Sequence, residues 1–149
     1  MKSKKISFIE IISVILILIV SFVIIKRIVV IGLDNKNSQK YIEDVNVFVE
    51  KATDLYKQEK IRNDTKYFTQ INGGYLITLD KITGVDITKD PYGYDYKKQE
   101  SNIIFKDKEE AIIINVKSCK TSDNVEKCRE IVNVNAKDLS TKSIKASIK

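Results

Sequence analysis

The chain has 149 residues, and its 26 basic and 20 acidic side chains give a formal net charge of +6 at neutral pH. It has no histidine, the side chain most often used as a general base in catalysis and a common metal ligand. It also lacks GxSxG, P-loop, HExxH and CxxC motifs. This composition argues against an enzyme, and we expect no resident cofactor.

The positive charge is concentrated near the N-terminus. Residues 1–33 hold five basic residues and one acidic residue, a net charge of +4, which leaves +2 for residues 34–149. A nucleic-acid-binding domain carries its basic excess on the folded surface rather than beside an apolar segment. The distribution therefore indicates membrane topology, and we expect no nucleic-acid partner.

An apolar run fills residues 6–25, which read ISFIEIISVILILIVSFVII and carry Glu10 as their only charge. As a helix this run would span about 30 Å, the thickness of the hydrocarbon core of a bilayer. After Lys26 and Arg27 the apolar character resumes as far as Leu33. We predict a transmembrane helix in residues 6–33. A cleaved signal peptide is the alternative, but its apolar region has about 7–15 residues and ends in small residues.

Lysines and cysteines indicate the orientation. Lys2, Lys4 and Lys5 precede the apolar run and favour a cytoplasmic N-terminus. Cys119 and Cys128 are the only cysteines, and a disulfide between them suits a compartment outside the cytoplasm, with two free thiols as the alternative. We expect a single-pass protein of the cytoplasmic membrane whose residues 34–149 form one extracytoplasmic domain.

Glu10 is unusual because it lies inside the apolar run. An ionised side chain at the bilayer centre costs up to roughly 2.5–3.5 kcal/mol, and less near the start of the helix. One interpretation is that Glu10 pairs with a positive charge on a neighbouring chain. The other is that its side chain reaches the headgroups and has no further role.

The residues KKISFIE at positions 4–10, followed by the aliphatic run, resemble the N-terminus of type IV pilins and pseudopilins. The resemblance implies that residues 1–5 are a basic leader, that prepilin peptidase cuts between Lys5 and Ile6, and that the new amine is methylated. Glu10 would then take the fifth mature position, where it pairs with the N-terminal amine of an adjoining subunit. Lys5 stands where the family usually has glycine.

A second helical pattern follows in residues 38–60. Its apolar side chains recur at spacings of three and four, which is typical of one stripe on an amphipathic helix. They are Tyr41, Ile42, Val45, Phe48, Val49, Ala52, Leu55 and Tyr56. We predict that this helix continues the membrane helix, with a break near Gly32 to Asn37. The pilin resemblance also implies such a helix, with its outer half packed on a sheet.

A turn rich in tyrosine is predicted at residues 88–96, after a short helix at residues 75–82. Its sequence matches the D-P-[WY]-G-x-x-Y motif of many pseudopilins and Gram-positive pilins at Asp90, Pro91, Tyr92, Gly93 and Tyr96. A generic turn is the alternative. The nearby loop binds calcium in some pseudopilins, and Asp90 and Asp95 are the candidate ligands here, although calcium takes six to eight oxygens.

Short strands complete the pattern at residues 94–97, 102–106, 111–117 and 129–135. Local turns between them predict an antiparallel meander, and residues 138–149 add an edge strand or fray. A bridge between Cys119 and Cys128 would join the ends of the last hairpin.

Together these features predict an α+β fold, in which a long N-terminal helix with a transmembrane half and an amphipathic half packs on a small antiparallel sheet. The resemblance implies a minor pilin or pseudopilin-like subunit of a type IV pilus or type II secretion-like assembly. Its partners would be the membrane, other pilin or pseudopilin subunits and prepilin peptidase. The alternatives are a membrane-anchored domain that does not polymerise and a competence pseudopilin that acts in DNA uptake.

Overall fold

A computed structural model describes residues 8–107 and 110–148 of the chain. The chain divides into two compact units, residues 1–36 and residues 37–149, which we describe separately. Lys5 and Ile6, where we expect processing, lie outside the described residues.

Helix α1 comprises Phe8–Lys57 and contributes to both units. Its part in the first unit is rich in isoleucine, valine and leucine, and the large apolar side chains described between Ile12 and Leu33 are 44–64% exposed. Residues 32–37, where we predicted a break, have helical conformation, so that prediction is wrong. A single glycine costs a helix only about 1 kcal/mol relative to alanine, and no proline interrupts this stretch.

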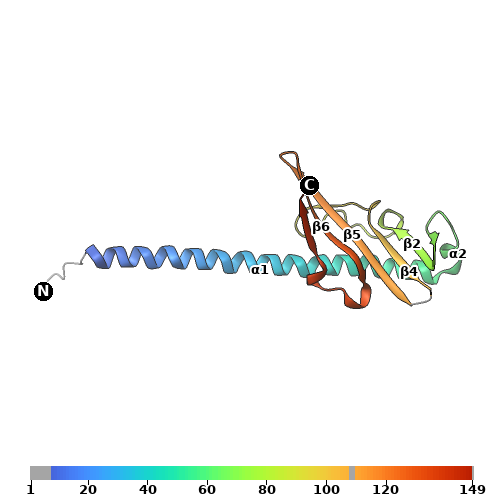
Figure 1. Ribbon diagram of the computed structural model, residues 1–149, viewed down its shortest axis with the longest axis horizontal. Coiled ribbons are helices and arrows are strands. Elements are labelled where there is room, and N and C mark those ends of the chain that lie inside the picture. The colour runs from blue at the N-terminus through green and yellow to red at the C-terminus, as the bar shows by residue number, and fades with distance from the viewer. Residues whose placement is uncertain (1–7, 108–109, 149) are drawn as a thin grey trace. The chain divides into compact units, whose positions relative to one another are not determined.

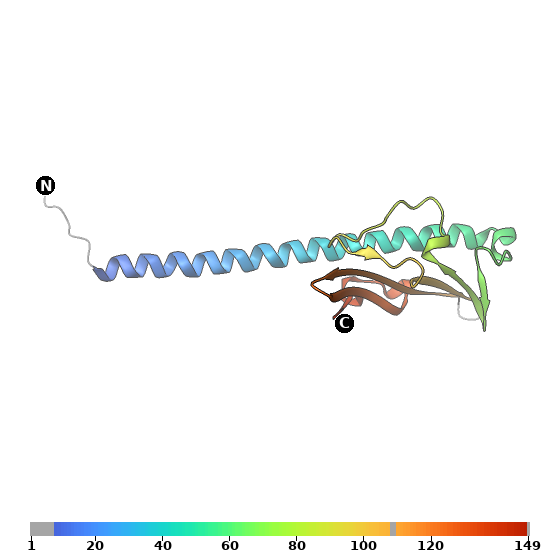
Figure 2. The same cartoon turned by 90° about the horizontal axis from the view of Figure 1, so that it is seen from above.

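In the second unit, residues 37–57 of α1 pack along one face of an antiparallel sheet (Figure 2). The helix contributes Tyr41, Val45, Phe48 and Ala52, all of which are fully buried. Their spacings of four, three and four place them on one stripe, as the amphipathic pattern predicted. A short second helix, α2 (Glu59–Arg62), follows.

The sheet has seven strands in the order β1-β2-β4-β5-β6-β7, with β3 paired to β5 (Figure 1). All pairs are antiparallel, so the α+β arrangement predicted from the sequence is confirmed. The strands are β1 (Thr69–Ile71), β2 (Gly74–Thr78), β3 (Asp95–Tyr96), β4 (Asn102–Lys106), β5 (Ala111–Ser122), β6 (Val125–Asn135) and β7 (Lys145–Ile148). Short 3₁₀ helices lie at η1 (Leu79–Lys81), η2 (Ala136–Asp138) and η3 (Thr141–Ser143).

The short helix predicted at residues 75–82 is wrong, because the first half of this segment belongs to strand β2. Tyr75 pairs with Phe105 and Ile77 pairs with Ile103, so β2 gains a ladder of hydrogen bonds and buried neighbours that no local pattern reveals. Gly74 allows this pairing, since a Cβ atom there would overlap the carbonyl oxygen of Phe105. Only residues 79–81 are helical, as η1.

The hairpin of β5 and β6 is longer than predicted. Its outer part is polar and therefore lacks the alternating pattern used to find strands. Asp123 and Asn124 form its two-residue turn with φ of 51° and 63°, the left-handed conformation that favours tight hairpins. The disulfide Cys119–Cys128 is present, but it joins directly paired residues inside the hairpin rather than at its ends.

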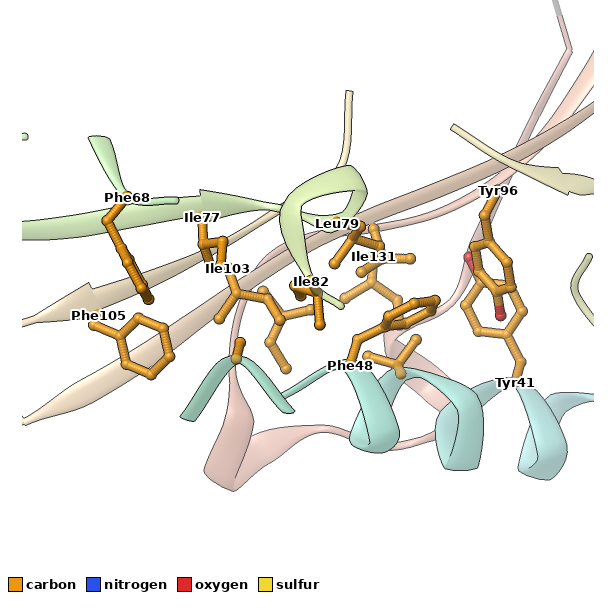
Figure 3. Packing of buried hydrophobic residues seen from close by; sticks show 14 residues of the cluster. Tyr41, Phe48, Phe68, Ile77, Leu79, Ile82, Tyr96, Ile103, Phe105 and Ile131 are labelled. Carbon is orange, nitrogen blue, oxygen red and sulfur yellow. The ribbon is translucent and has the colours of Figure 1, made fainter. Parts of the chain in front are cut away.

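Aromatic and aliphatic side chains fill the space between α1 and the sheet (Figure 3). At one end Tyr56 stacks on Phe105 with 4.2 Å between ring centroids. At the other end Phe48 meets Tyr96 edge-on at 5.4 Å. Ile103 and other fully buried aliphatic residues lie between these two aromatic groups. The core therefore holds residues 41–56 of the helix against strands β2 to β6.

The disulfide yields a test of hairpin stability. Replacing Cys119 and Cys128 together by alanine should lower the free energy of unfolding of the full chain in detergent micelles by about 2.7 kcal/mol, because the bridge closes a ten-residue loop of the unfolded chain. Urea unfolding under oxidising conditions measures this difference. With dithiothreitol present, the wild type and the double variant should unfold at similar urea concentrations. Equal stability under oxidising conditions would contradict the prediction.

Candidate functional site

The first candidate surface is the apolar part of α1. By length and composition, one helix near the N-terminus is long and apolar enough to cross a membrane, and its most apolar stretch is not buried against other parts of the described chain. The ammonium group of Lys26 lies 4.6 Å from the centre of the Phe22 ring, so this charge rests on an aromatic neighbour of its own helix. Glu10 belongs to α1, but its side chain lies outside what the structure describes. Its pairing therefore stays a prediction.

The second candidate site is the turn at residues 88–96, which is organised around the carboxylate of Asp90. Asp90 is only 4% exposed. One of its oxygens accepts hydrogen bonds from the backbone N–H groups of Tyr92 and Tyr94, at 2.9 and 2.8 Å. The other accepts a bond from the hydroxyl of Ser118 at 2.6 Å. These three donors explain how the carboxylate is accommodated in the interior.

The backbone of the turn closes around this carboxylate. The Asp90 N–H donates to the carbonyl of Tyr94 at 2.8 Å, and the Gly93 N–H donates to the carbonyl of Asp90 at 2.9 Å. Gly93 has φ of 78°, a conformation that a residue with a side chain adopts only with strain. Pro91 supplies the restricted φ that suits the second position of a turn. Each of these motif residues thus has a structural reason to be there.

The last motif residue, Tyr96, is buried in the core next to α1. The centre of its ring lies 5.7 Å from the ring centre of Tyr41 and 5.4 Å from that of Phe48. Its hydroxyl donates a hydrogen bond to a carboxylate oxygen of Asp44 at 3.4 Å. Burial raises the pKa of Asp44, an effect that the hydrogen bond from Tyr96 and the charge of Lys40 oppose. The motif therefore contacts the helix through both an aromatic ring and a polar group.

Arg129 of β6 joins the turn to the hairpin. Its guanidinium lies 3.5 Å from the centre of the Tyr92 ring and 4.9 Å from that of Tyr94. Burial tends to lower the pKa of Arg129, but hydrogen bonds with Tyr94 and Tyr92 outweigh burial and raise it above its usual value. The Tyr92 hydroxyl also shares a 2.6 Å hydrogen bond with Ser38 of α1. The turn thus connects the helix to the outer part of the β5–β6 hairpin.

The two carboxylates considered for calcium are engaged separately. Asp90 faces its three hydrogen-bond donors, whereas Asp95 forms an ion pair with Lys89 at 3.1 Å. Among the residues that the structure describes, the one cluster of three metal-binding side chains consists of Cys119, Glu126 and Cys128. Its two sulfur atoms are joined in the disulfide and therefore do not offer thiolate ligands.

No protein-family profile matches the chain, and comparisons with curated proteins and with solved structures found no match. The function must therefore be argued from the residues and the geometry of the two candidate sites.

Sequence reasoning identified the motif but missed its partners. Three of these partners, Ser38, Asp44 and Ser118, lie 28 to 54 positions away in the sequence from the motif residues that they contact. The fourth partner is Arg129, which reaches Tyr92 from strand β6. One signal was available for Ser118, since it is a polar residue two positions after Val116 on the buried face of a strand. Polar residues at such positions usually have a buried hydrogen-bond partner.

The buried carboxylate can be tested by mutation. Asp90→Ala removes the acceptor for two backbone N–H groups and one hydroxyl, so it should lower the free energy of unfolding by about 3 kcal/mol. Asp90→Asn keeps one carbonyl oxygen and should cost less. Asp86→Ala changes an exposed residue of the same loop and should stay within about 0.5 kcal/mol of wild type. Urea unfolding of the full chain measures all three, and equal effects of Asp90→Ala and Asp86→Ala would refute the role of Asp90.

The buried tyrosines predict sensitivity to alkaline pH. Burial is the main reason that the pKa values of Tyr41 and Tyr96 are raised in the folded protein. The unfolded chain loses these protons near pH 10 while the folded chain keeps them. Stability is therefore fully present below about pH 10 and falls above it, by about 1.4 kcal/mol per pH unit for each tyrosine. In urea unfolding between pH 9 and 11, Tyr41→Phe with Tyr96→Phe should reduce this slope, and an unchanged slope would contradict the prediction.

Proposed function

We propose that the chain is a minor pilin or pseudopilin-like subunit that is held in the cytoplasmic membrane by residues 6–33 and assembles through this segment into a fibre. The observation that carries the proposal is the division of α1. The large apolar side chains that the structure describes in its first part are exposed, whereas its last part packs on an antiparallel sheet. A helix that needs lipid or other helices at one end, and carries a folded domain at the other, suits a subunit that moves from bilayer to fibre core.

Glu10 has a defined task under this proposal. In the low dielectric of a helix bundle, a carboxylate near the helix start favours a register in which a positive charge of the adjoining subunit lies next to it. The N-terminal amine produced by cleavage before Ile6 would supply that charge. The aliphatic side chains would supply most of the contact area, whereas the charge pair would select the axial position.

The turn at residues 88–96 supports the proposal through its contacts. Tyr92 of the turn shares a hydrogen bond with Ser38 of α1. Tyr96 donates a hydrogen bond to Asp44 of α1, and its ring contacts that of Tyr41. These contacts concentrate at the end of the domain where the chain enters it. A subunit in a fibre has to transmit force between its helix and its domain, and such a connection resists separation of the two.

The expected topology places the second unit outside the cytoplasm. Lys2, Lys4 and Lys5 favour a cytoplasmic N-terminus. The disulfide Cys119–Cys128 supports the same assignment, because structural disulfides persist in oxidising compartments.

A membrane-anchored domain that does not polymerise is the second candidate, and one observation favours it. Lys5 occupies the position at which the processed family usually has glycine. The N-terminal mass of the native protein distinguishes the two. Loss of residues 1–5 together with gain of one methyl group supports the subunit, and an intact leader supports the anchor.

The assembly role predicts the effect of one substitution. Glu10→Ala should leave the second unit folded, with an unchanged unfolding midpoint, and should reduce the amount of the protein in the sheared surface fraction of its host about tenfold. A loss of that size corresponds to about 1.4 kcal/mol of register-selecting interaction. Glu50→Ala is the matched control, since it removes an exposed acid from the other end of the same helix. Equal recovery of the Glu10→Ala variant and the wild type from that fraction would remove the pairing role.

A further inference from the structure

The outer part of the β5–β6 hairpin has a basic face. Residues that pair directly in antiparallel strands project to the same side of the sheet. Lys120 pairs with Lys127. Two residues further from the hairpin turn along each strand, Ser118 pairs with Arg129. Ser122 and Val125 pair at the tip, while β7 adds Ile148 beside Lys127. We call Lys120, Lys127, Arg129, Val125 and Ile148 the basic face.

The charges on this hairpin are segregated. Lys120 and Lys127 are both exposed, and like charges placed directly opposite each other destabilise a sheet. The acidic residues of β6 project to the other side. Glu126 forms an ion pair with Lys97 at 3.5 Å, and Glu130 pairs across the strands with Lys117. The contacts described for this hairpin thus do not explain why two lysines oppose each other on the basic face, whereas an anionic partner would.

The basic face also exposes aliphatic side chains. Val125 is 36% exposed and Ile148 is 74% exposed. Lysine side chains beside exposed aliphatic groups are typical of protein surfaces that lie at a lipid headgroup layer, because the aliphatic groups enter the layer while the ammonium groups stay among the phosphates. A surface that binds the phosphates of a nucleic acid would not bury the exposed Ile148 side chain in this way.

The basic face lies at the end of the domain where α1 enters. Tyr56 stacks on Phe105, which pairs with Ile112 near the start of β5. Tyr41 lies beside Ser118, with 3.4 Å between their hydroxyl oxygens. Strand β5 therefore runs toward the N-terminal end of the packed helix, and residues 119–122 continue past Tyr41 by about 13 Å. Only seven residues, 34–40, lie between Tyr41 and Leu33, the last residue of the apolar run.

We propose that the basic face binds the anionic headgroups of the membrane that holds the apolar segment. The inference goes beyond assembly into a fibre, and it depends on the membrane anchor alone. Because the domain is tethered to the bilayer, its effective concentration at the surface is high and a few charges suffice to dock it. Each lysine near an anionic surface strengthens docking several-fold, so neutralising both lysines lowers the docked-to-undocked ratio roughly 30-fold.

The absence of tryptophan from the chain allows a direct test. The full chain with Val125→Trp is reconstituted into vesicles of phosphatidylcholine, part of it brominated, with or without phosphatidylglycerol at about a third of the lipid. Flotation of the vesicles first verifies that the protein has inserted. We expect brominated lipid to quench the fluorescence of the introduced indole only in the vesicles that contain phosphatidylglycerol. Quenching should also disappear in about 0.5 M salt, which screens surface charges.

Matched variants make the test specific. In the Val125→Trp chain, Lys120→Gln with Lys127→Gln should abolish most of the quenching. Lys57→Gln with Lys60→Gln makes the same change in net charge at exposed positions near the other end of the packed helix, and should not. Equal quenching with and without phosphatidylglycerol, or no quenching at all in inserted protein, would overturn the proposal. A fluorescence response of the introduced indole to duplex DNA but not to phosphatidylglycerol would overturn it in favour of a nucleic-acid partner.

Discussion

The packing of Tyr41, Val45, Phe48 and Ala52 against the sheet is the interaction on which the folded unit depends. It gives residues 37–57 of α1 a protein environment, whereas the aliphatic residues before them have none within the described chain. Exposure of these residues to water is unfavourable, and the helix that holds them is long and apolar enough to cross a membrane. One helix thus serves two environments, and the proposed function follows from that division.

The Asp90 turn strengthens the same connection by polar contacts. Its carboxylate is buried, and three hydrogen bonds from the turn and from Ser118 compensate for its desolvation. Tyr92 and Tyr96 then contact the helix, while Arg129 stacks on Tyr92 from the hairpin. A helix that packed by apolar contacts alone could slide along the sheet, whereas these directed contacts select one register.

The proposed fibre-subunit function and the proposed lipid-binding face are compatible as two stages of one sequence of events. Before assembly, the membrane segment would anchor the chain, and Lys120 and Lys127 would hold the domain against the headgroups. Entry into a fibre would remove the domain from the surface and break those weak, salt-sensitive contacts. Docking would therefore orient the subunit without preventing its extraction.

The sequence by itself determined the parts of the protein that follow from local pattern. Hydropathy identifies the apolar run, the spacing of three and four identifies the stripe from Tyr41 to Tyr56, and alternation identifies β4 at Asn102–Lys106. Only the tertiary structure decided that Tyr75–Thr78 is a strand, that the hairpin extends to Ser122, and that Arg129 meets Tyr92. The outer part of the hairpin pairs locally, but its polar residues lack the alternation that marks a strand. The other two features depend on partners far apart in the sequence, since Tyr75 pairs with Phe105 and Arg129 meets Tyr92. A local pattern carries no information about such a partner, because the energy that selects it arises only when the two segments meet.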